Sequence, residues 1–206
     1  MIEKELYFIR HGQTDHNKKG IVQGKGVNLP LNELGQRQAR GFFEMYKGVQ
    51  FDKIYTSTLL RAQETIYPFR ELGFDFEPRP ELDEISWGAM EGNATVMENS
   101  DDFRNLTDQW KAGNDHAKPQ GGESPHDLQT RQLHFIEHLK TQPYKTILVS
   151  MHGRAIRCMM CTLTGTPLRL MEDFPHVNLS LYKVNLLQGG KFEIEKFNDT
   201  THLENI

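Results

Sequence analysis

The sequence has little of the features that mark several special classes of protein. Its 206 residues include only two cysteines, Cys158 and Cys161, so no disulfide framework can support the fold. No apolar signal segment follows the start, and no run approaches the roughly 18 uninterrupted apolar residues of a membrane-spanning helix. A chain of this length buries roughly 70% of its unfolded surface without such supports. We therefore expect a single domain, residues 1–206, in a soluble, cytoplasmic protein.

An excess of basic residues is also absent. Lys and Arg number 24 against 28 Asp and Glu, and the formal net charge is −4. Nucleic-acid-binding domains usually carry a clear excess of Lys and Arg on one face, so we exclude nucleic acid as a partner. An anionic substrate must then be held by a local cluster of cations. The positions of individual arginines therefore carry the information.

Strand and helix patterns alternate along the chain. Short segments that are apolar on both faces predict buried central strands, and longer segments with one apolar stripe predict helices, one of them capped by Asn32. This alternation is typical of an α/β fold. We expect a three-layer α/β/α sandwich with a mostly parallel mixed sheet, whose last two strands form an antiparallel hairpin through "QGG". The expected strands are 6–9, 53–56, 146–150, 179–184 and 192–197, and the expected helices are 33–47, 59–72, 126–140 and 154–164.

A polar stretch from about residue 92 to residue 124 interrupts this alternation. It is rich in Gly and Asn and only weakly periodic, apart from one helical pattern around 100–111. We interpret the stretch as an excursion over the edge of the sheet where a ligand binds.

Two predicted strands end in the same pair of residue types. "LYFIRHG" ends in Arg10 and His11 before a glycine, and "TILVSMHG" ends in His152 and Gly153. Ligands of open α/β sheets bind outside the carboxyl ends of the strands. Two His-Gly pairs at that edge are hard to explain by chance, so we interpret them as part of a ligand site. A third strand runs into "STLLRAQET", which places Arg61 one turn into a helix at the same edge.

These residues together predict a site for a phosphoryl group. Planar guanidinium forks and helix N-terminal amides suit a tetrahedral dianion, and a neutral imidazole can attack phosphorus to form a phosphoramidate that water later opens. A leaving alkoxide needs a proton, and a carboxyl beside a bound dianion favours the protonated form that a general acid requires. The alternative for Arg61 is an ordinary solvated arginine on a helix. The candidate acids in "ELDEISWGAMEG" are Glu81, Asp83, Glu84 and Glu91.

Five motifs in this order resemble the histidine phosphatase superfamily, in its phosphoglycerate mutase-like branch: "RHGQTDHN", "STLLRAQET", "LDEISWGAMEG", "GGES" and "HGRAIR". The resemblance runs from Leu6 to about Leu181. It implies that His11 is phosphorylated and that Glu84 donates the proton. It also implies that Gln23 lies at the pocket wall and that the "GGES" loop, with Glu123 and Ser124, lies on the substrate side. The groups that it assigns to phosphoryl binding are Arg10, Arg61, His152, Asn17 and the backbone amide of Gly153.

The sequence departs from the family pattern at two points. Three residues, rather than the usual two, separate Gly24 from Asn28, which leaves the alignment of Gln23 open. The second His-Gly pair is usually followed by another glycine, whereas here Arg154 adds a cation beside the pocket. Arg154 either contacts the substrate or points to solvent.

The segment after the acid motif separates a phosphatase from a mutase. Mutase members of the family usually carry an arginine pair and a proline-rich stretch that clamp the substrate carboxylate and shield the intermediate from water. Residues 93–120 contain one arginine, Arg104, and one proline, Pro119. We therefore predict a phosphomonoester phosphatase that needs no metal or other cofactor and acts on a small phosphorylated metabolite. The alternatives are a cofactor-dependent phosphoglycerate mutase, which would use 2,3-bisphosphoglycerate, and a non-catalytic phosphate-binding protein.

Three other patterns indicate different chemistry and fit less well. "GIVQGKG" lacks the spacing and the Ser or Thr of a nucleotide phosphate loop. "HFIEH" matches an inverted zinc-protease signature, but His134 and His138 lie off the apolar face of that helix and are expected to face solvent. "CMMC" has redox spacing but lies well inside a helix, so Cys158 and Cys161 are expected to be buried thiols.

Overall fold

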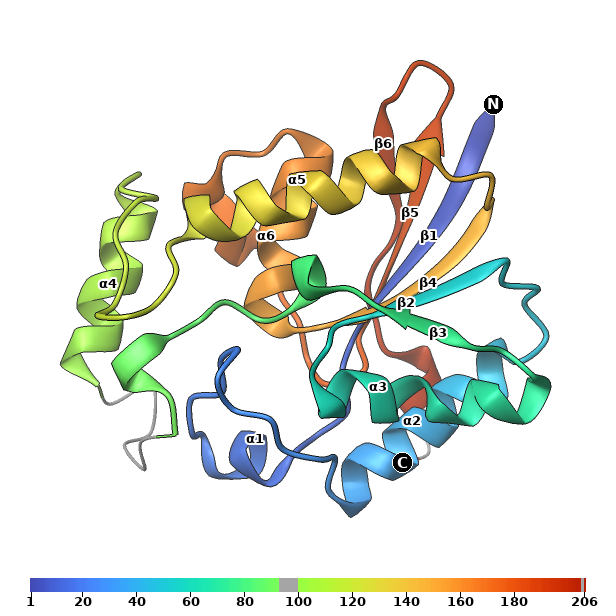
Figure 1. Ribbon diagram of the computed structural model, residues 1–206, viewed down its shortest axis with the longest axis horizontal. Helices are drawn as coiled ribbons and strands as arrows, with labels where there is room; N and C mark the ends of the chain where they lie inside the picture. The colour runs from blue at the N-terminus through green and yellow to red at the C-terminus, as the bar shows by residue number, and fades with distance from the viewer. Residues whose placement is uncertain (93–99, 205) are drawn as a thin grey trace.

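The central sheet is mixed, with its parallel strands on one side and an antiparallel hairpin on the other (Figure 1). A computed structural model describes residues 1–92, 100–204 and 206 of the chain. Its strands are Ile2–Arg10 (β1), Lys53–Thr56 (β2), Phe76–Pro78 (β3), Thr146–Met151 (β4), Leu181–Leu187 (β5) and Phe192–Asp199 (β6). The order across the sheet is β3-β2-β4-β1-β5-β6, parallel from β3 to β1 and antiparallel from β1 to β6. The predicted mostly parallel mixed sheet is confirmed.

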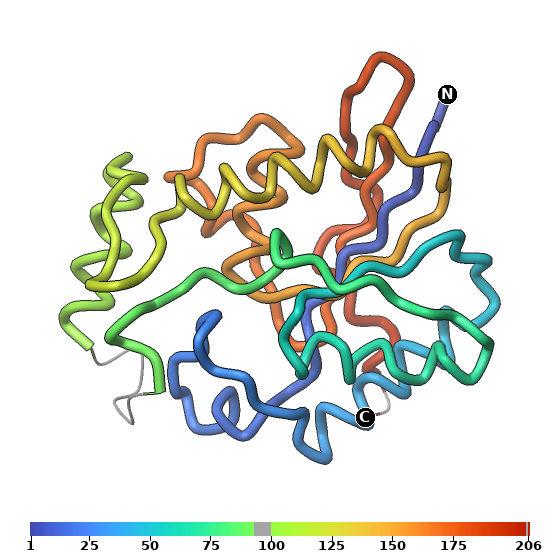
Figure 2. The backbone as a smooth tube through the Cα atoms, in the orientation of Figure 1, coloured from blue at the N-terminus to red at the C-terminus, as the bar shows by residue number. Residues whose placement is uncertain are grey.

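Helices cover both faces of this sheet. The α-helices of the described residues are Asp15–Lys19 (α1), Glu33–Tyr46 (α2), Leu60–Ile66 (α3), Asp101–Lys111 (α4), Pro125–Thr141 (α5) and Gly153–Thr164 (α6). The backbone trace places α2 and α3 on one side of the sheet and α5 and α6 on the other (Figure 1, Figure 2). The predicted α/β sandwich is therefore confirmed. Over the described ranges, no helix is both long enough and apolar enough to cross a membrane.

Side chains of β1 alternate between two hydrophobic cores. Leu6 and Phe8 pack into the core that includes the apolar residues of α5 and α6, whereas Tyr7 and Ile9 pack into the core that includes the aromatic residues of α2. Successive side chains of a strand point to opposite faces, so a strand that is covered on both faces must be apolar at every position. The uninterrupted apolar run "LYFI" has this cause.

Most predicted elements differ by a few residues at their ends, and in two of them the difference has a clear local cause. The helix expected over 59–72 is α3 followed by a tighter 3-10 helix, Tyr67–Leu72. Pro68 lies at the start of that second segment, where it has no N–H to continue the α-helical ladder. The strand expected over 179–184 is β5, which begins two residues later because Leu179 takes a positive φ of 61°. Such a conformation is uncommon outside glycine and interrupts strand pairing.

Two short elements lie outside the prediction. Helix α1 has five residues and is capped by reciprocal hydrogen bonds between Thr14 and Asn17. Strand β3 has three residues and pairs only with β2, at the edge of the sheet. Neither is long enough to show a periodic pattern.

The predicted excursion contains the helix expected around 100–111, which is α4. Ser100 caps it by accepting a hydrogen bond from the backbone N–H of Phe103. The helix is anchored by Trp110, which is 2% exposed and lies against Trp87 with ring centroids 5.5 Å apart. Residues 93–99 of the excursion lie outside the described residues.

The structure also shows where the side chains of the "CMMC" and "HFIEH" patterns lie. Cys158 and Cys161 are buried free thiols in α6, as expected, and burial raises the pKa of Cys161 to about 12. His134 is exposed, as expected. The expectation is wrong for His138, which is half-buried because its Nε2 lies 3.0 Å from the Tyr55 hydroxyl and forms a hydrogen bond with it.

Two glycines allow the end of β1 to approach α2 closely. A Cβ on Gly12 would lie 2.6 Å from the carbonyl oxygen of Gly35, and a Cβ on Gly35 would lie 2.2 Å from that of Gln13. These neighbours are backbone atoms, so relief would require the helix to move. Gly12 also donates its N–H to the Thr65 hydroxyl of α3, at 3.0 Å. The turn after β1 is therefore held between two helices.

We expect Gly12→Ala to lower the free energy of unfolding by roughly 1–3 kcal/mol, because overpacking against backbone cannot relax cheaply. Gly48→Ala is the matched control, since a Cβ there meets nothing within 4 Å, and we expect it to change stability by less than about 0.5 kcal/mol. Urea unfolding followed by tryptophan fluorescence measures both. Equal effects of the two substitutions would contradict the close-packing explanation.

Candidate active site

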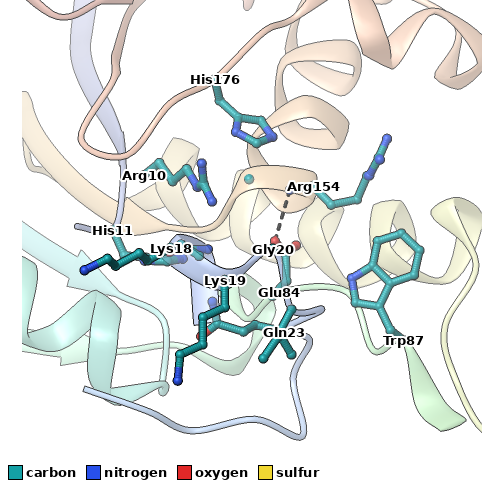
Figure 3. A pocket seen from close by; sticks show the side chains of 13 residues that line it. Arg10, His11, Lys18, Lys19, Gly20, Gln23, Glu84, Trp87, Arg154 and His176 are labelled. Carbon is teal, nitrogen blue, oxygen red and sulfur yellow. Dashed lines mark hydrogen bonds between the residues drawn. The ribbon is translucent and has the colours of Figure 1, made fainter. Parts of the chain in front are cut away.

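A cavity of about 520 Å³ opens where β1 and β4 end, between α1, α6 and the segment that carries the predicted acid (Figure 3). It gathers seven of the predicted site residues: Arg10, His11, Asn17, Gln23, Glu84, Gly153 and Arg154. The other described lining residues are Lys18, Lys19, Gly20, Ile21, Trp87 and His176. His152 lies immediately behind the lining, with its ring centroid 5.1 Å from that of His11. The two predicted strand ends therefore meet at one site.

His11 is buried in the neutral form that attacks an electrophile. Its Nδ1 lies 2.7 Å from the carbonyl oxygen of Gly12. A carbonyl oxygen can only accept, so Nδ1 carries the proton and the lone pair of a neutral ring is on Nε2. Burial, and then the positive charges of Arg61 and Arg10, hold the pKa of His11 well below its usual range. At neutral pH the ring is therefore uncharged, with Nε2 available.

Two arginines flank this imidazole: Arg61 is fully buried, and Arg10 is half-buried and lines the cavity. Arg61 is therefore not the solvated helix arginine of the alternative interpretation, which is wrong. It donates hydrogen bonds to the carbonyl oxygens of Val27, at 2.5 Å, and Gly24, at 3.2 Å. Burial lowers the pKa of Arg10 and of Arg61 to about 10, so both stay charged at neutral pH. The buried Nε atoms of both arginines have no hydrogen-bond partner among the described residues.

The loop that carries Gln23 is tied to α3 despite its extra residue. Arg61 holds the carbonyl groups on either side of the insertion, and the Asn28 side chain accepts a hydrogen bond from the backbone N–H of Leu60 at 2.7 Å. The Gln23 amide donates to the Thr14 hydroxyl at 2.8 Å. The extra residue is therefore accommodated within the loop, and Gln23 lies at the pocket wall.

Asn17 presents hydrogen-bond donors to the cavity. Its Oδ1 accepts from the backbone N–H of Thr14 and from Nδ2 of Asn178, both at 3.2 Å. With its acceptor oxygen occupied inside the protein, the Nδ2 group forms no hydrogen bond to a described residue and lines the cavity side. Asn178 also donates to the carbonyl oxygen of His11 at 3.0 Å. Asn178 thus connects the nucleophile and Asn17, a role with no sequence signal.

Glu84 is held at the N-terminus of α6. Its Oε1 accepts backbone N–H hydrogen bonds from Ile85 and Ala155 at 2.9 Å, and its Oε2 accepts one from Arg154 at 3.1 Å (Figure 3). These three backbone N–H groups fix the orientation of the carboxyl group. Glu84 is 7% exposed and faces the cavity. A group so placed can deliver a proton to, or take one from, a ligand bound beside His11.

The other candidate acids are occupied elsewhere. Glu81 forms an ion pair with Arg79 at 2.8 Å. Asp83 accepts a hydrogen bond from Ser57 at 2.7 Å. Glu91 accepts a hydrogen bond from the backbone N–H of Trp87. Of the four carboxyls, Glu84 is the one that lines the cavity among the described residues.

The expected substrate-side placement of Glu123 and Ser124 is wrong, because neither lines the cavity among the described residues. Glu123 accepts hydrogen bonds from Arg131 and from the backbone N–H of Ser86, at 3.0 and 2.9 Å. Ser124 is 1% exposed and caps α5 by accepting from the backbone N–H of Asp127. Arg131 also donates to the carbonyl oxygen of Glu84 at 2.9 Å. The "GGES" loop therefore supports the acid segment from behind.

Arg154 does not point to solvent. It is 9% exposed, forms an ion pair with Glu172 at 2.5 Å, and lies 5.8 Å and 5.4 Å from the ring centroids of Trp87 and Trp110. The cation therefore sits against aromatic faces at one side of the cavity. The solvent-facing alternative is therefore wrong, and contact with the substrate stays a prediction.

His176 completes the wall beside Arg10 (Figure 3). Its ring packs so closely on Gly153 that a Cβ there would lie 2.5 Å from the ring carbon Cε1. Gly153 therefore allows both the ring and the backbone amide to face the cavity. Burial and the nearby arginines, Arg10 first among them, lower the pKa of His176 to about 2. The sequence has no motif at this position, in the loop before β5.

Comparison with known proteins decides the family. The family model described as histidine phosphatase superfamily (branch 1) matches residues 6–200. The chain belongs to the histidine phosphatase superfamily. A relative in Hydrogenobacter thermophilus, provisionally named phosphoserine phosphatase 2, is 29% identical over 97% of both chains. A relative in Photorhabdus laumondii, provisionally named phosphoglycerate mutase, is 28% identical over 97% of this chain and 95% of its own.

A solved structure agrees with this assignment. The α-ribazole phosphatase from Shigella flexneri superposes with a TM-score of 0.81 at 26% identity, over 95% of this chain and 96% of its own. Phosphatase names thus occur among both sequence and structure relatives of this histidine phosphatase, with the mutase name as the alternative. The chain is an enzyme of phosphoryl transfer, of the histidine phosphatase type.

The buried histidines predict how stability of this histidine phosphatase depends on pH. The pKa values of His11, His152 and His176 are all lowered, mainly by burial. Below the unfolded value of about 6.5 the unfolded chain binds protons that the folded chain does not, so stability is full above that pH and falls as pH falls. Each histidine then contributes a loss of up to about 1.4 kcal/mol per pH unit.

We expect His176→Gln to reduce the slope by up to about 1.4 kcal/mol per pH unit below pH 6.5, and the exposed His134→Gln to leave it unchanged. Urea unfolding at several pH values between about 5.5 and 7.5 measures the slope. A slope that is the same in wild type and His176→Gln would show that His176 takes up its proton in the folded state as well.

Proposed function

We propose that this enzyme hydrolyses small phosphomonoesters through a phosphohistidine formed on His11. The observation that carries the proposal is the neutral imidazole of His11, with Nε2 available, between two arginines whose buried Nε groups lack partners among the described residues. Buried donors without partners are costly, and a tetrahedral dianion bound beside His11 would satisfy them. The site is therefore built to bind a phosphoryl group next to a nucleophile.

The proposed reaction has two steps. A phosphoryl dianion is bound by Arg10, Arg61, Asn17, His152 and the amide of Gly153. Nε2 of His11 attacks phosphorus, the ester P–O bond breaks, and the leaving oxygen takes the proton of Glu84. Glu84 then accepts a proton from water as that water attacks phosphorus, the P–N bond breaks, and inorganic phosphate leaves. The two arginines favour both steps because they stabilise the charge of the phosphoryl group from fixed positions.

Phosphoglycerate mutase activity is the second candidate. It is favoured by the mutase-named relative, whose identity to this chain, 28%, is close to the 29% of the phosphatase-named one. The two functions share the phosphohistidine and differ in whether water or a second acid takes the phosphoryl group. We favour hydrolysis because residues 93–120 lack the arginine pair and proline-rich stretch of mutase members.

The leaving group of the substrate is proposed to be anionic. Arg10 and Arg61 are assigned to the phosphoryl group, yet Lys18 and Lys19 also line the cavity, whereas Glu84 is the one carboxyl among its described lining residues. Arg154 lines it too, but is paired with Glu172. The names of two relatives, a phosphoserine phosphatase and a phosphoglycerate mutase, refer to substrates that carry a carboxylate. A phosphomonoester with a carboxylate on its leaving group therefore fits the excess of positive charge.

Glu84→Gln separates leaving groups by their need for a proton. We expect kcat/KM to fall about 100-fold or more for an alkyl phosphate and less than about 10-fold for p-nitrophenyl phosphate, because nitrophenolate leaves without protonation. Labelled substrate should trap an acid-labile adduct in this variant. Glu81→Gln is the control, since Glu81 pairs with Arg79 away from the cavity.

Equal losses for the two substrates would contradict the acid role of Glu84. A labelled adduct that is acid-stable, or that persists in His11→Ala, would contradict the phosphohistidine. An isomerisation rate of 3-phosphoglycerate, with 2,3-bisphosphoglycerate added, that exceeds its hydrolysis would favour the mutase.

A matched pair of substrates tests the anionic leaving group. 3-Phosphoglycerate and glycerol 3-phosphate differ in a carboxylate and a hydroxymethyl group, and we expect the first to have the higher kcat/KM. Lys18→Gln/Lys19→Gln should lower kcat/KM for 3-phosphoglycerate by about tenfold, the loss of one good charge contact, and change that for glycerol 3-phosphate less than about threefold. Lys47→Gln, at an exposed ion pair with Glu44, is the control. Equal losses of kcat/KM for both substrates would show that Lys18 and Lys19 act on the phosphoryl group and not on the leaving group.

A further inference from the structure

A buried chain of hydrogen bonds connects Asp83 with His152, and none of the roles above accounts for it. The Ser57 hydroxyl lies 2.7 Å from Asp83 Oδ1 and 2.7 Å from His152 Nε2. Ser57 and His152 are completely buried, and Asp83 is 2% exposed. Asp83, Ser57 and His152 therefore form a line of buried, hydrogen-bonded side chains that ends beside His11.

The direction of each hydrogen bond follows from the chemistry of the groups. A carboxylate only accepts, so the Ser57 hydroxyl gives its proton to Asp83. The Ser57 oxygen then accepts from His152 Nε2–H, and also from the backbone N–H of Leu59 at 3.1 Å. Nε2 of His152 therefore carries a proton, and the lone pair of a neutral His152 is on Nδ1.

Nδ1 of His152 is buried and has no partner among the described residues. Its ring lies 5.1 Å from the ring of His11, at the place where the proposed dianion binds. A lone pair repels the oxygen of a dianion, whereas an N–H at the same atom would donate a charge-assisted hydrogen bond to it. Binding of a dianion and protonation of Nδ1 should therefore favour each other.

The neighbours of His152 set the balance between its two forms. Burial, and then the positive charges led by that of Arg61, lower the pKa of His152 and keep it neutral in the free enzyme. The hydrogen bonds through Ser57 to Asp83 bring a negative charge that favours its protonated form. A bound dianion would neutralise the positive neighbours and shift the balance. The charged and titratable groups that surround it are His11, Arg10, Arg61, Arg131 and, through Ser57, Asp83.

We propose that Ser57 and Asp83 are positioning residues that make His152 a proton-coupled ligand of the phosphoryl group. His152 takes up one proton at Nδ1 when the dianion binds and gives it back when phosphate leaves. The proton comes from solvent or from the monoanion of the ester, and no covalent bond to a heavy atom changes. This proposal rests on the proposed function, because it needs the dianion to bind beside His11.

Sulfate is the probe, because it is a tetrahedral dianion with no titratable proton near neutral pH. Calorimetric titrations in buffers of different ionisation enthalpy, near pH 7.5, count the protons that the protein takes up. The background is His11→Asn, which removes the other imidazole at the site. We expect uptake close to one proton per bound sulfate, and close to none when His152→Gln is added.

The positioning residues are tested in the same background. Ser57→Ala and Asp83→Asn should each lower proton uptake and weaken sulfate binding by about tenfold, as expected for a charge-assisted hydrogen bond. Thr58→Ala is the matched control, because the exposed Thr58 hydroxyl donates to the same Asp83 carboxylate, at 2.9 Å, but lies outside the line. A merely structural role of Asp83 would make Thr58→Ala resemble Asp83→Asn in proton uptake.

Two outcomes overturn the proposal in different ways. Sulfate binding without proton uptake, or with uptake that survives His152→Gln, contradicts the role of His152 and leaves the phosphoryl site intact. No sulfate binding in the His11→Asn protein or in the wild type contradicts the phosphoryl site as well, and with it the proposed function.

Discussion

Withdrawal of two arginines from water beside an imidazole, one fully and one in part, is the constraint around which the carboxyl edge of the sheet is organised. Removing a charged group from water costs several kcal/mol unless partners compensate. Arg61 recovers part of this cost from the carbonyl groups of Gly24 and Val27, and Arg10 from the negative charge of Glu84. Neither arrangement satisfies the buried Nε atoms. The part of the desolvation cost that is not recovered favours binding of an anion. The folded protein is therefore preorganised for an anionic ligand.

The need to compensate the buried charge of Arg61 also explains why segments that are far apart in the sequence are joined by hydrogen bonds at this edge. Arg61 can be buried only where carbonyl oxygens face it, and the loop of Gln23 supplies them. That loop meets Thr14, whose partner Asn17 is held by Asn178, which also holds the backbone of His11. Three of the residues joined by these contacts, Gln23, Asn17 and His11, line the cavity. The geometry of the site is thus a property of tertiary packing and of no single motif.

Sequence reasoning succeeded where the physical signal is local. Strands β1 and β4 are covered on both faces, and their uninterrupted apolar runs predict them. His11 and His152 are predicted as site residues because ligands bind at strand ends. His176 and Asn178 lie in an aperiodic loop, and their roles arise only when that loop crosses the end of β1. Ser124 is a case in which a local signal was present and was not used. It stands three residues before Asp127, which is a helix-capping pattern. The family resemblance gave it a substrate role instead.

The acid segment shows how the fold divides neighbouring residues of one chemical type. Asp83 and Glu84 are consecutive, and alternate direction along an extended backbone sends their carboxyls to different partners. Asp83 reaches Ser57 at the end of β2 and acts on His152, whereas Glu84 reaches the first turn of α6 and faces the cavity beside His11. Arg131 holds the Glu84 carbonyl between them. Two adjacent residues of one segment therefore carry the carboxyl proposed to protonate the leaving group and the carboxylate proposed to act through Ser57. A shift of the backbone at either residue would displace the other as well.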